Sequence, residues 1–201
     1  MSGREIRLPA PKAVKGLKFG ILKNVAMENV VDLPKKAFEN SIDKLKKAGA
    51  SVSEILVPSV DEAMELTGLL YSPEAYATWK HKIEKTPDLM FTKILERFRS
   101  GANVLASDFI CAWDKLMDLR QQYHSVVKMY DAVLIPTSPI IPPELDRLMN
   151  DGDFYNSQNL LALRNTRIGN LMGGCSITLP TDIPSCGLLI MGMPSQEERL
   201  L

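Results

Sequence analysis

Short apolar runs alternate with a segment of helical periodicity over the first sixty residues. Residues 17–22 form an apolar run typical of a buried strand, and residues 52–57 alternate as a second strand does. Between them, apolar side chains recur at helical spacing from a cap at Asp32 to a stop at Gly49: Phe38, Ile42 and Leu45. This β-α-β order predicts a parallel pair of strands joined by a right-handed crossover.

The middle of the chain is predicted to be helical. From Ser107 onward, large apolar residues mark one face of a helix of about six turns. They are Phe109, Trp113, Leu116, Tyr123, Val127 and Tyr130. We interpret this face as part of the hydrophobic core.

Three local motifs predict helix starts within this region. The pattern Ser59-x-x-Glu62 indicates a capping box, in which each side chain binds a free backbone amide near the start of the helix. The pairs Ser72-Pro73 and Thr86-Pro87 each combine a capping residue with a proline in the first helical position. We therefore expect separate helices to begin at each of these points.

The last third of the chain predicts three more strands around one helix. Residues 131–135 form a short apolar strand that runs into a proline-rich loop over 136–143. A helix is expected from about residue 158 to 172, where a pair of glycines ends it. Strands over 176–179 and 188–191 follow, joined by a turn. The whole pattern predicts an α/β fold, with residues 1–16 as an extended lead-in and 17–201 as a single domain.

A second capping box lies at the end of the chain. The pattern Ser195-x-x-Glu198 begins a helix, and the sequence stops three residues later at Leu201. We interpret this as a truncated protein and expect the domain to be part of a larger one.

Composition and charge exclude several classes of function. Hydrophobic residues make up 45% of the chain and charged residues 24%, as in ordinary globular proteins. Lysine plus arginine (24) balances aspartate plus glutamate (24), so no net charge favours nucleic acid or an anionic membrane as partner. The apolar run over 187–193 is too short to span a bilayer, and residues 1–11 contain no signal-peptide core. A cytoplasmic location is expected.

Few residues are arranged for metal, cofactor or nucleophilic chemistry. The three cysteines are odd in number and widely spaced, which predicts free thiols. His81 and His124 lie on separate predicted helices without further ligands, and no glycine-rich phosphate loop follows the first strand. We therefore expect no metal and no cofactor. Cys175 and Ser176 follow two glycines and could expose a nucleophile, but no base is paired with them, so we interpret the segment as tight packing.

Six segments in order resemble the C-terminal half of the amidase signature family. They are KGLKFGIL (15–22), LKKAGASV (45–52), Arg-x-x-x-Gly (97–101) with Asp108 and Arg120 beyond it, YDAVLIPT (130–137), Thr-x-x-x-Asn-x-x-Gly (166–173) and CGLLIMG (186–192). The segment 130–137 is the most specific match, and the resemblance covers 15–201. Two positions depart from the family pattern: Gly174 stands where proline is usual, and Ser185-Cys186 replaces proline-valine.

The resemblance implies a mixed sheet flanked by helices and an activity on carbon–nitrogen amide bonds. The family's catalytic lysine, cis-serine and nucleophilic serine lie in its N-terminal half, in a stretch rich in Gly-Ser-Ser-Gly. No such stretch occurs in these 201 residues. Without lysine and the bridging serine, no group lowers the barrier to deprotonating a nucleophile. We therefore predict no catalytic residue here, and a chain that is inactive alone.

The resemblance also suggests where a small amide substrate would lie in the full-length family fold. Five residues are candidates for the pocket: Tyr71, Glu74, Tyr76, Arg164 and Thr166. Leu163 occupies the position before the Thr-x-x-x-Asn segment where glutamine-handling members place an acidic residue, which disfavours a transfer-RNA amidotransferase subunit.

Three functional hypotheses stay open from the sequence. The first is the C-terminal portion of an amidase, and the second is a non-catalytic binding or assembly module that retains half of the fold. The third is a fragment of a transfer-RNA amidotransferase subunit. If half of a larger sheet is absent, exposed apolar surface or an unpaired strand edge also predicts a homo-oligomer, a symmetric dimer.

Overall fold

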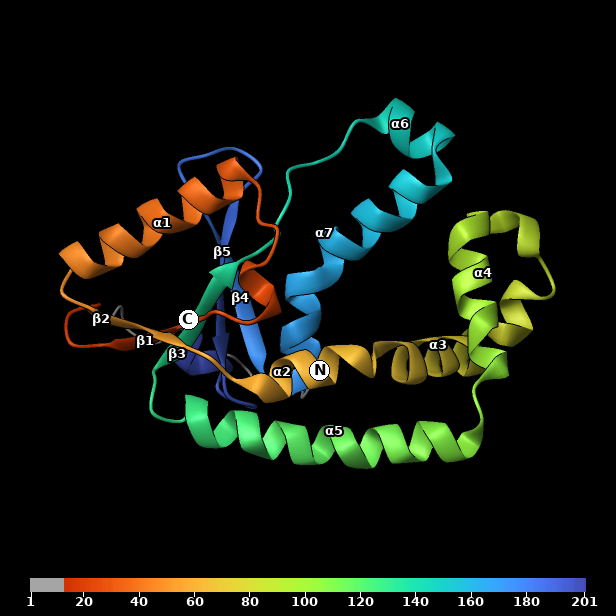
Figure 1. Ribbon diagram of the computed structural model, residues 1–201, viewed down its shortest axis with the longest axis horizontal. Helices are drawn as coiled ribbons and strands as arrows, with labels where there is room; N and C mark the ends of the chain where they lie inside the picture. Colours follow the sequence, from red (N-terminus) through yellow and green to blue (C-terminus); the bar gives the residue numbers. More distant parts are fainter. Residues whose placement is uncertain (1–12) are drawn as a thin grey trace.

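The computed structural model describes residues 13–201 and contains a five-stranded mixed sheet (Figure 1). Its strands are β1 (Lys18–Leu22), β2 (Ser51–Ile55), β3 (Ala132–Pro136), β4 (Cys175–Pro180) and β5 (Gly187–Gly192). The spatial order is β2-β1-β3-β5-β4; β2, β1 and β3 are parallel, whereas β5 is antiparallel to both β3 and β4. The predicted α/β class and the mixed sheet are confirmed.

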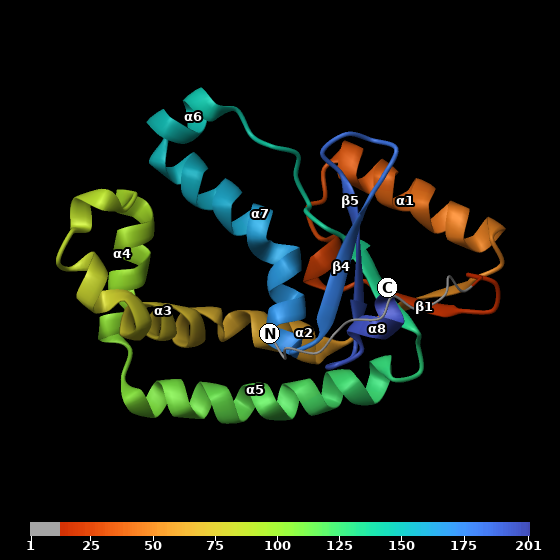
Figure 2. The same cartoon turned by 180° about the vertical axis from the view of Figure 1, so that it is seen from behind.

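Helices surround the sheet and extend beyond one end of it (Figures 1 and 2). They are α1 (Asp32–Lys47), α2 (Pro58–Glu65), α3 (Thr67–Ile83), α4 (Thr92–Ser100), α5 (Ala106–Val127), α6 (Leu145–Asn150), α7 (Gly152–Met172) and α8 (Glu197–Leu200). Short 3₁₀ helices occur at η1 (Val25–Met27), η2 (Pro87–Leu89) and η3 (Gly101–Asn103). The helix α4 and the far end of α3 lie away from the strands (Figure 1).

Two hydrophobic clusters hold the layers together. The smaller one joins α1 to one face of the sheet through Phe38 and Ile42, which cluster with Leu134 of β3. The larger one joins the opposite face to α2, α5 and α7, and includes Ile135 of β3 and Ile168 of α7. Every residue of β3 is buried, because this strand is covered on both faces. An uninterrupted apolar run is the pattern that such a position requires.

The helix that begins at Thr67 continues through Pro73, where the sequence predicted a new start. The hydroxyl of Ser72 donates to the carbonyl of Gly68 within the same helix, at 2.7 Å, so it does not cap anything. Proline removes one backbone hydrogen bond from α3, but packing of η3 against this point keeps the helix continuous. The prediction of a helix start at Ser72-Pro73 was wrong for this reason.

The two predicted capping boxes do not form either. The hydroxyl of Ser59 is buried without a hydrogen-bond partner, and Val57 stands at the cap position of α2. Ser195 lies one residue before the cap of α8 in a left-handed conformation (φ 60°), and no side chain caps that helix. Asp151 does cap α7, accepting from the amide of Phe154 at 2.9 Å. This cap starts α7 six residues earlier than predicted.

Three further features of the described residues concern free thiols, membrane spans and metal ligands. All three cysteines are free: Cys111 is exposed, and Cys175 and Cys186 are partly buried. Within residues 13–201, no helix is long and apolar enough to cross a membrane, and no three acidic, histidine or cysteine side chains gather as metal ligands. Most of the predicted lead-in lies outside the described residues, and the single domain over 17–201 stays a prediction.

Candidate functional site

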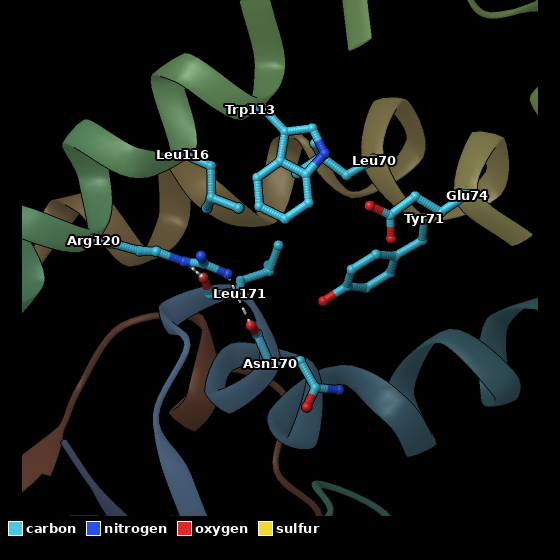
Figure 3. Close-up of a pocket in the computed structure, with 8 residues that line it drawn as sticks. All are labelled: Leu70, Tyr71, Glu74, Trp113, Leu116, Arg120, Asn170 and Leu171. Atoms are coloured by element: carbon cyan, nitrogen blue, oxygen red, sulfur yellow. Dashed lines mark hydrogen bonds between the residues drawn. The ribbon is translucent and has the colours of Figure 1, made fainter. Parts of the chain in front are cut away.

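The first of two neighbouring hollows lies between α3, α5 and the end of α7 (Figure 3). It encloses about 290 Å³. Its lining consists of Leu70, Tyr71, Glu74, Trp113, Leu116, Arg120, Asn170 and Leu171. Leucine and tryptophan side chains form an apolar wall, and the remaining residues place a carboxylate, a phenol, a guanidinium and an amide around it. Such a mixture suits a small organic ligand with one or two polar groups.

The second hollow lies on the other side of Tyr71, between α3, α4 and α7, and encloses about 490 Å³. Its lining consists of Thr67, Gly68, Tyr71, Ser72, Arg97, Ser100, Leu160, Leu163, Thr166, Arg167 and Asn170. Tyr71 and Asn170 line both hollows, so one side chain from α3 and one from α7 separate them. The two cavities together form the candidate site.

Tyr71 carries a polar group that nothing in the described part of the chain satisfies. Its hydroxyl is buried and has no hydrogen-bond partner among residues 13–201. In Figure 3 the hydroxyl points from α3 toward α7. Burial raises the pKa of Tyr71 above its usual value, although the nearby Arg167 and Arg120 oppose that rise. The phenol is therefore neutral at physiological pH and is a free hydrogen-bond donor.

Arg120 fixes the position of α5 against the end of α7. Its Nε donates to the carbonyl of Leu171 at 2.5 Å, and Nη2 donates to the carbonyl of Asn170 at 3.4 Å (Figure 3). A cation at this point complements the negative end of the helix dipole. The guanidinium also lies 5.5 Å from the ring centre of Trp113. With these contacts made, Arg120 forms a rigid wall of the first cavity.

The five residues predicted for the pocket separate into two groups. Tyr71 and Glu74 line the first cavity, and Tyr71 and Thr166 line the second. Tyr76 and Arg164 line neither. The structure therefore brings three of the five together and leaves two elsewhere.

Arg164 is 7% exposed and holds the loop after β1 against α7. Its Nη2 donates to the carbonyls of Glu28 at 2.7 Å and Ala26 at 3.3 Å. Burial lowers the pKa of Arg164, and the charge of Glu28 opposes that effect. Through these contacts the guanidinium group joins two segments of the chain.

Tyr76 lies near the ion pair of Arg99 and Glu84 rather than in a cavity. Arg99 donates to both carboxylate oxygens of Glu84, at 2.9 and 2.7 Å. The hydrogen bond from Arg99 is the main reason that the pKa of Glu84 is lowered, and Tyr76 adds a smaller effect in the same direction. Both residues of the pair are exposed enough that water screens it.

Most of the lining residues were not predicted as part of the site, among them Trp113, Arg120, Arg167 and Asn170. Helical spacing could have found them. Arg120 follows Trp113 by seven residues, which is two turns of α5, and Asn170 follows Arg167 by three. The missing information was which face of each helix meets α3, and that depends on tertiary packing.

The segment around Cys175 is packed and unactivated. The thiol of Cys175 donates to the carbonyl of Met193 at 3.2 Å, and burial raises its pKa, so the reactive thiolate is disfavoured. Across residues 13–201, no serine, threonine or cysteine side chain hydrogen-bonds to a lysine or histidine side chain. This agrees with the interpretation of residues 173–176 as a tight helix-to-strand connection.

Comparison with known proteins gives a family match over nearly the whole chain. The family model described as Amidase matches residues 2–201. The 2-amino-5-chloromuconic acid deaminase of Comamonas testosteroni is 28% identical over 96% of this chain and 43% of its own length. A glutamyl-tRNA(Gln) amidotransferase chain of Clostridium acetobutylicum is 26% identical over 88% of this chain and 41% of its own.

Solved structures show the same fold. The allophanate hydrolase of Kluyveromyces lactis superposes with a TM-score of 0.77 at 18% identity, covering 92% of this chain and 30% of that one. The chain therefore spans about two fifths of the length of the curated relatives that it matches.

Proposed function

Because this chain belongs to the amidase family, we propose that it forms part of the substrate pocket of an amide-hydrolysing enzyme and supplies none of its nucleophilic chemistry. The observation that carries the proposal is the buried, unpartnered hydroxyl of Tyr71 between two cavities of the described chain. A buried donor without a partner costs about 1–3 kcal/mol, which a bound acceptor recovers. An amide carbonyl is such an acceptor.

The first cavity suits a primary amide in a defined orientation. The hydroxyl of Tyr71 would donate to the amide oxygen, and the carboxylate of Glu74 would accept from the amide nitrogen. Trp113 and Leu116 would cover the carbon chain of the ligand. These groups bind and orient an amide but cannot attack it, because no nucleophile and base are paired among the described residues.

We expect no amidase turnover above buffer when the 201-residue chain is tested alone on short aliphatic amides, aryl amides and glutamine. Removing both nucleophile and base leaves at most the small contribution of binding. The release of ammonia from these amides measures the turnover. If release appears, Cys175→Ala and Ser176→Ala decide its origin: loss in either variant would contradict the packing interpretation, and persistence in both indicates a contaminating hydrolase.

The same chain should bind a small amide without cleaving it. A thermal shift with propionamide, followed by calorimetry, measures binding. Tyr71→Phe removes only the hydroxyl and should weaken binding about five- to tenfold. Tyr76→Phe is the matched control, since its ring lies outside both cavities. Equal weakening in both variants, or none in Tyr71→Phe, would contradict the proposed pocket.

The amidotransferase hypothesis keeps support from the relative of Clostridium acetobutylicum, whereas Leu163 in place of an acidic residue argues against it. Neighbouring genes separate these alternatives. An in-frame upstream segment with a lysine and a Gly-Ser-Ser-Gly stretch favours an amidase, and adjacent genes for other amidotransferase subunits favour the amidotransferase. A stand-alone gene with its own promoter favours the binding or assembly module.

We further propose that the isolated chain self-associates as a symmetric dimer. In the described part of the chain, β4 is an edge strand that pairs only with β5, and Leu179 on it is 43% exposed. Such an edge is a template for pairing with a second copy. Light scattering at micromolar concentration should give about twice the chain mass of 22.4 kDa.

Leu179→Lys should shift this protein to the monomer, because charged edge residues oppose strand pairing. Leu89→Lys, at a position that is 86% exposed on η2, is the control and should leave the dimer intact. A clean monomer in the unmodified chain would overturn the proposal. A cytoplasmic location is proposed as well, since three free thiols persist in a reducing compartment.

A further inference from the structure

We propose that the cavity between α3, α4 and α7 binds a carboxylate, so that the substrate class is amides that also carry an acid group. Arg167 would be the residue that holds it, while the hydroxyl of Tyr71 donates to the amide. This inference rests on the proposed amide pocket and adds the chemical class of its ligand. Four observations carry it: the charge of the lining, the free donors, the asymmetry of the two cavities and the apolar stretch beside them.

The lining of this cavity is cationic. It contains Arg97 and Arg167, and none of its eleven lining residues is acidic. Arg97 donates to the side-chain oxygen of Asn159 at 2.6 Å, so part of its donor capacity is used. Arg167 forms no ion pair with any residue between 13 and 201. The two guanidinium groups repel each other, which contributes to lowering the pKa of Arg167, although burial is the larger cause. An anion between them would oppose both effects, because its charge favours the protonated guanidinium.

Most hydroxyl groups in the lining have their protons committed to the backbone. Thr166 donates to the carbonyl of Leu163, Ser72 to that of Gly68, and Ser100 to that of Arg97, at 3.2, 2.7 and 2.7 Å. Three donor groups in the lining make no hydrogen bond within residues 13–201: the hydroxyl of Tyr71, the guanidinium of Arg167 and the side-chain amide of Asn170. The planar fork of N–H groups on Arg167 matches the two oxygens of a carboxylate.

The cavities on the two sides of Tyr71 differ in charge. Glu74 lines only the first, where the one arginine is already bound to two carbonyls. Arg97 and Arg167 line only the second. A ligand with an amide at one end and a carboxylate at the other would therefore bind in one direction, its carboxylate toward Arg167 and its amide toward Glu74. Leu160 and Leu163, each about half exposed, would contact the intervening methylene groups.

Calorimetry on the 201-residue chain tests the carboxylate site with three ligands of equal length: succinamate, succinamide and succinate. Succinamate should bind at least about tenfold more tightly than succinamide, because a charged hydrogen-bonded pair is stronger than a neutral one. Arg167→Gln should abolish that difference, and Arg167→Lys should restore only part of it, since lysine lacks the fork. Lys36→Gln, an exposed residue of α1, is the control for the change in net charge and should keep the full difference.

The outcomes separate the carboxylate site from the amide pocket. Equal binding of succinamate and succinamide would overturn the carboxylate site and leave the amide pocket standing. Arg167-dependent binding of succinate and succinamate, without binding of succinamide, would support the carboxylate site and contradict the amide pocket. No binding of either carboxylate overturns the inference. Equal competition by inorganic phosphate would overturn the assignment to a carboxylate in particular.

Discussion

Asn165→Ala is expected to lower the free energy of unfolding by about 3 kcal/mol or more, because it leaves several buried polar groups unpaired. Asn165 is fully buried on α7. Its amide nitrogen donates to the carbonyl of Pro136 at 2.7 Å and to that of Ala26 at 3.1 Å, and its oxygen accepts from Arg164 Nε at 3.1 Å. One side chain thus joins β3, the loop after β1 and α7.

Denaturant unfolding followed by circular dichroism measures this effect, and the melting temperature should fall by roughly 6–12 °C. Asn165→Asp should be at least as damaging, since a carboxylate would face two carbonyl oxygens without solvent. The control is Asn40→Ala on α1, where the asparagine is exposed and the change should be near zero. A loss below about 1 kcal/mol in Asn165→Ala would contradict the role given to this network.

The strands and the long helix α5 could be predicted from sequence because their patterns are local. The apolar run of β3 and the helical stripe of α5 each occupy one continuous segment; β3 was found within one residue, and the predicted stripe of α5 runs three residues past its end at Val127. Capping was predicted poorly. Ser59 and Ser72 have the right residue type for a cap, but packing of neighbouring segments buries the first and continues the helix through the second. Such a pattern identifies a residue that is able to cap a helix, but it does not show whether a helix begins at that residue.

The candidate site was only partly predictable for a related reason. Tyr71 and Glu74 come from one turn of α3, so their resemblance to a family segment located both. Arg167 enters the site from α7 only because that helix lines the same cavity as α3, and no local pattern encodes where two distant helices are placed. Arg164 shows the opposite error, because it was predicted for the pocket and lies outside both cavities. This arginine, three residues earlier on the same helix, lines neither cavity and instead binds backbone carbonyls of the loop after β1.

Gly101 of η3 lies in tight contact with α3, beside the second cavity. A methyl group there would overlap the carbonyl of Ser72 and lie 2.6 Å from the nitrogen of Pro73. These are backbone atoms and cannot rotate away. Gly101→Ala should therefore force η3 off α3 and lower the free energy of unfolding by about 3 kcal/mol, the upper end for overpacking. The backbone conformation of Gly101 is ordinary (φ −63°), so the effect would come from space alone.

Gly68→Ala on α3 is the matched control, because a methyl group at that position meets nothing within 4 Å. It should stabilise the protein by roughly 0.5–1 kcal/mol through helix propensity. Gly68 itself lines the second cavity, so this control applies to the free energy of unfolding and not to ligand binding. Ser72 and Ser100 line this cavity on either side of the Gly101 contact, so Gly101→Ala should weaken ligand binding even below its melting temperature. A Gly101→Ala protein as stable as the parent, measured in the same denaturant series, would show that η3 is free to move away from α3, and the second cavity would then lack a fixed wall.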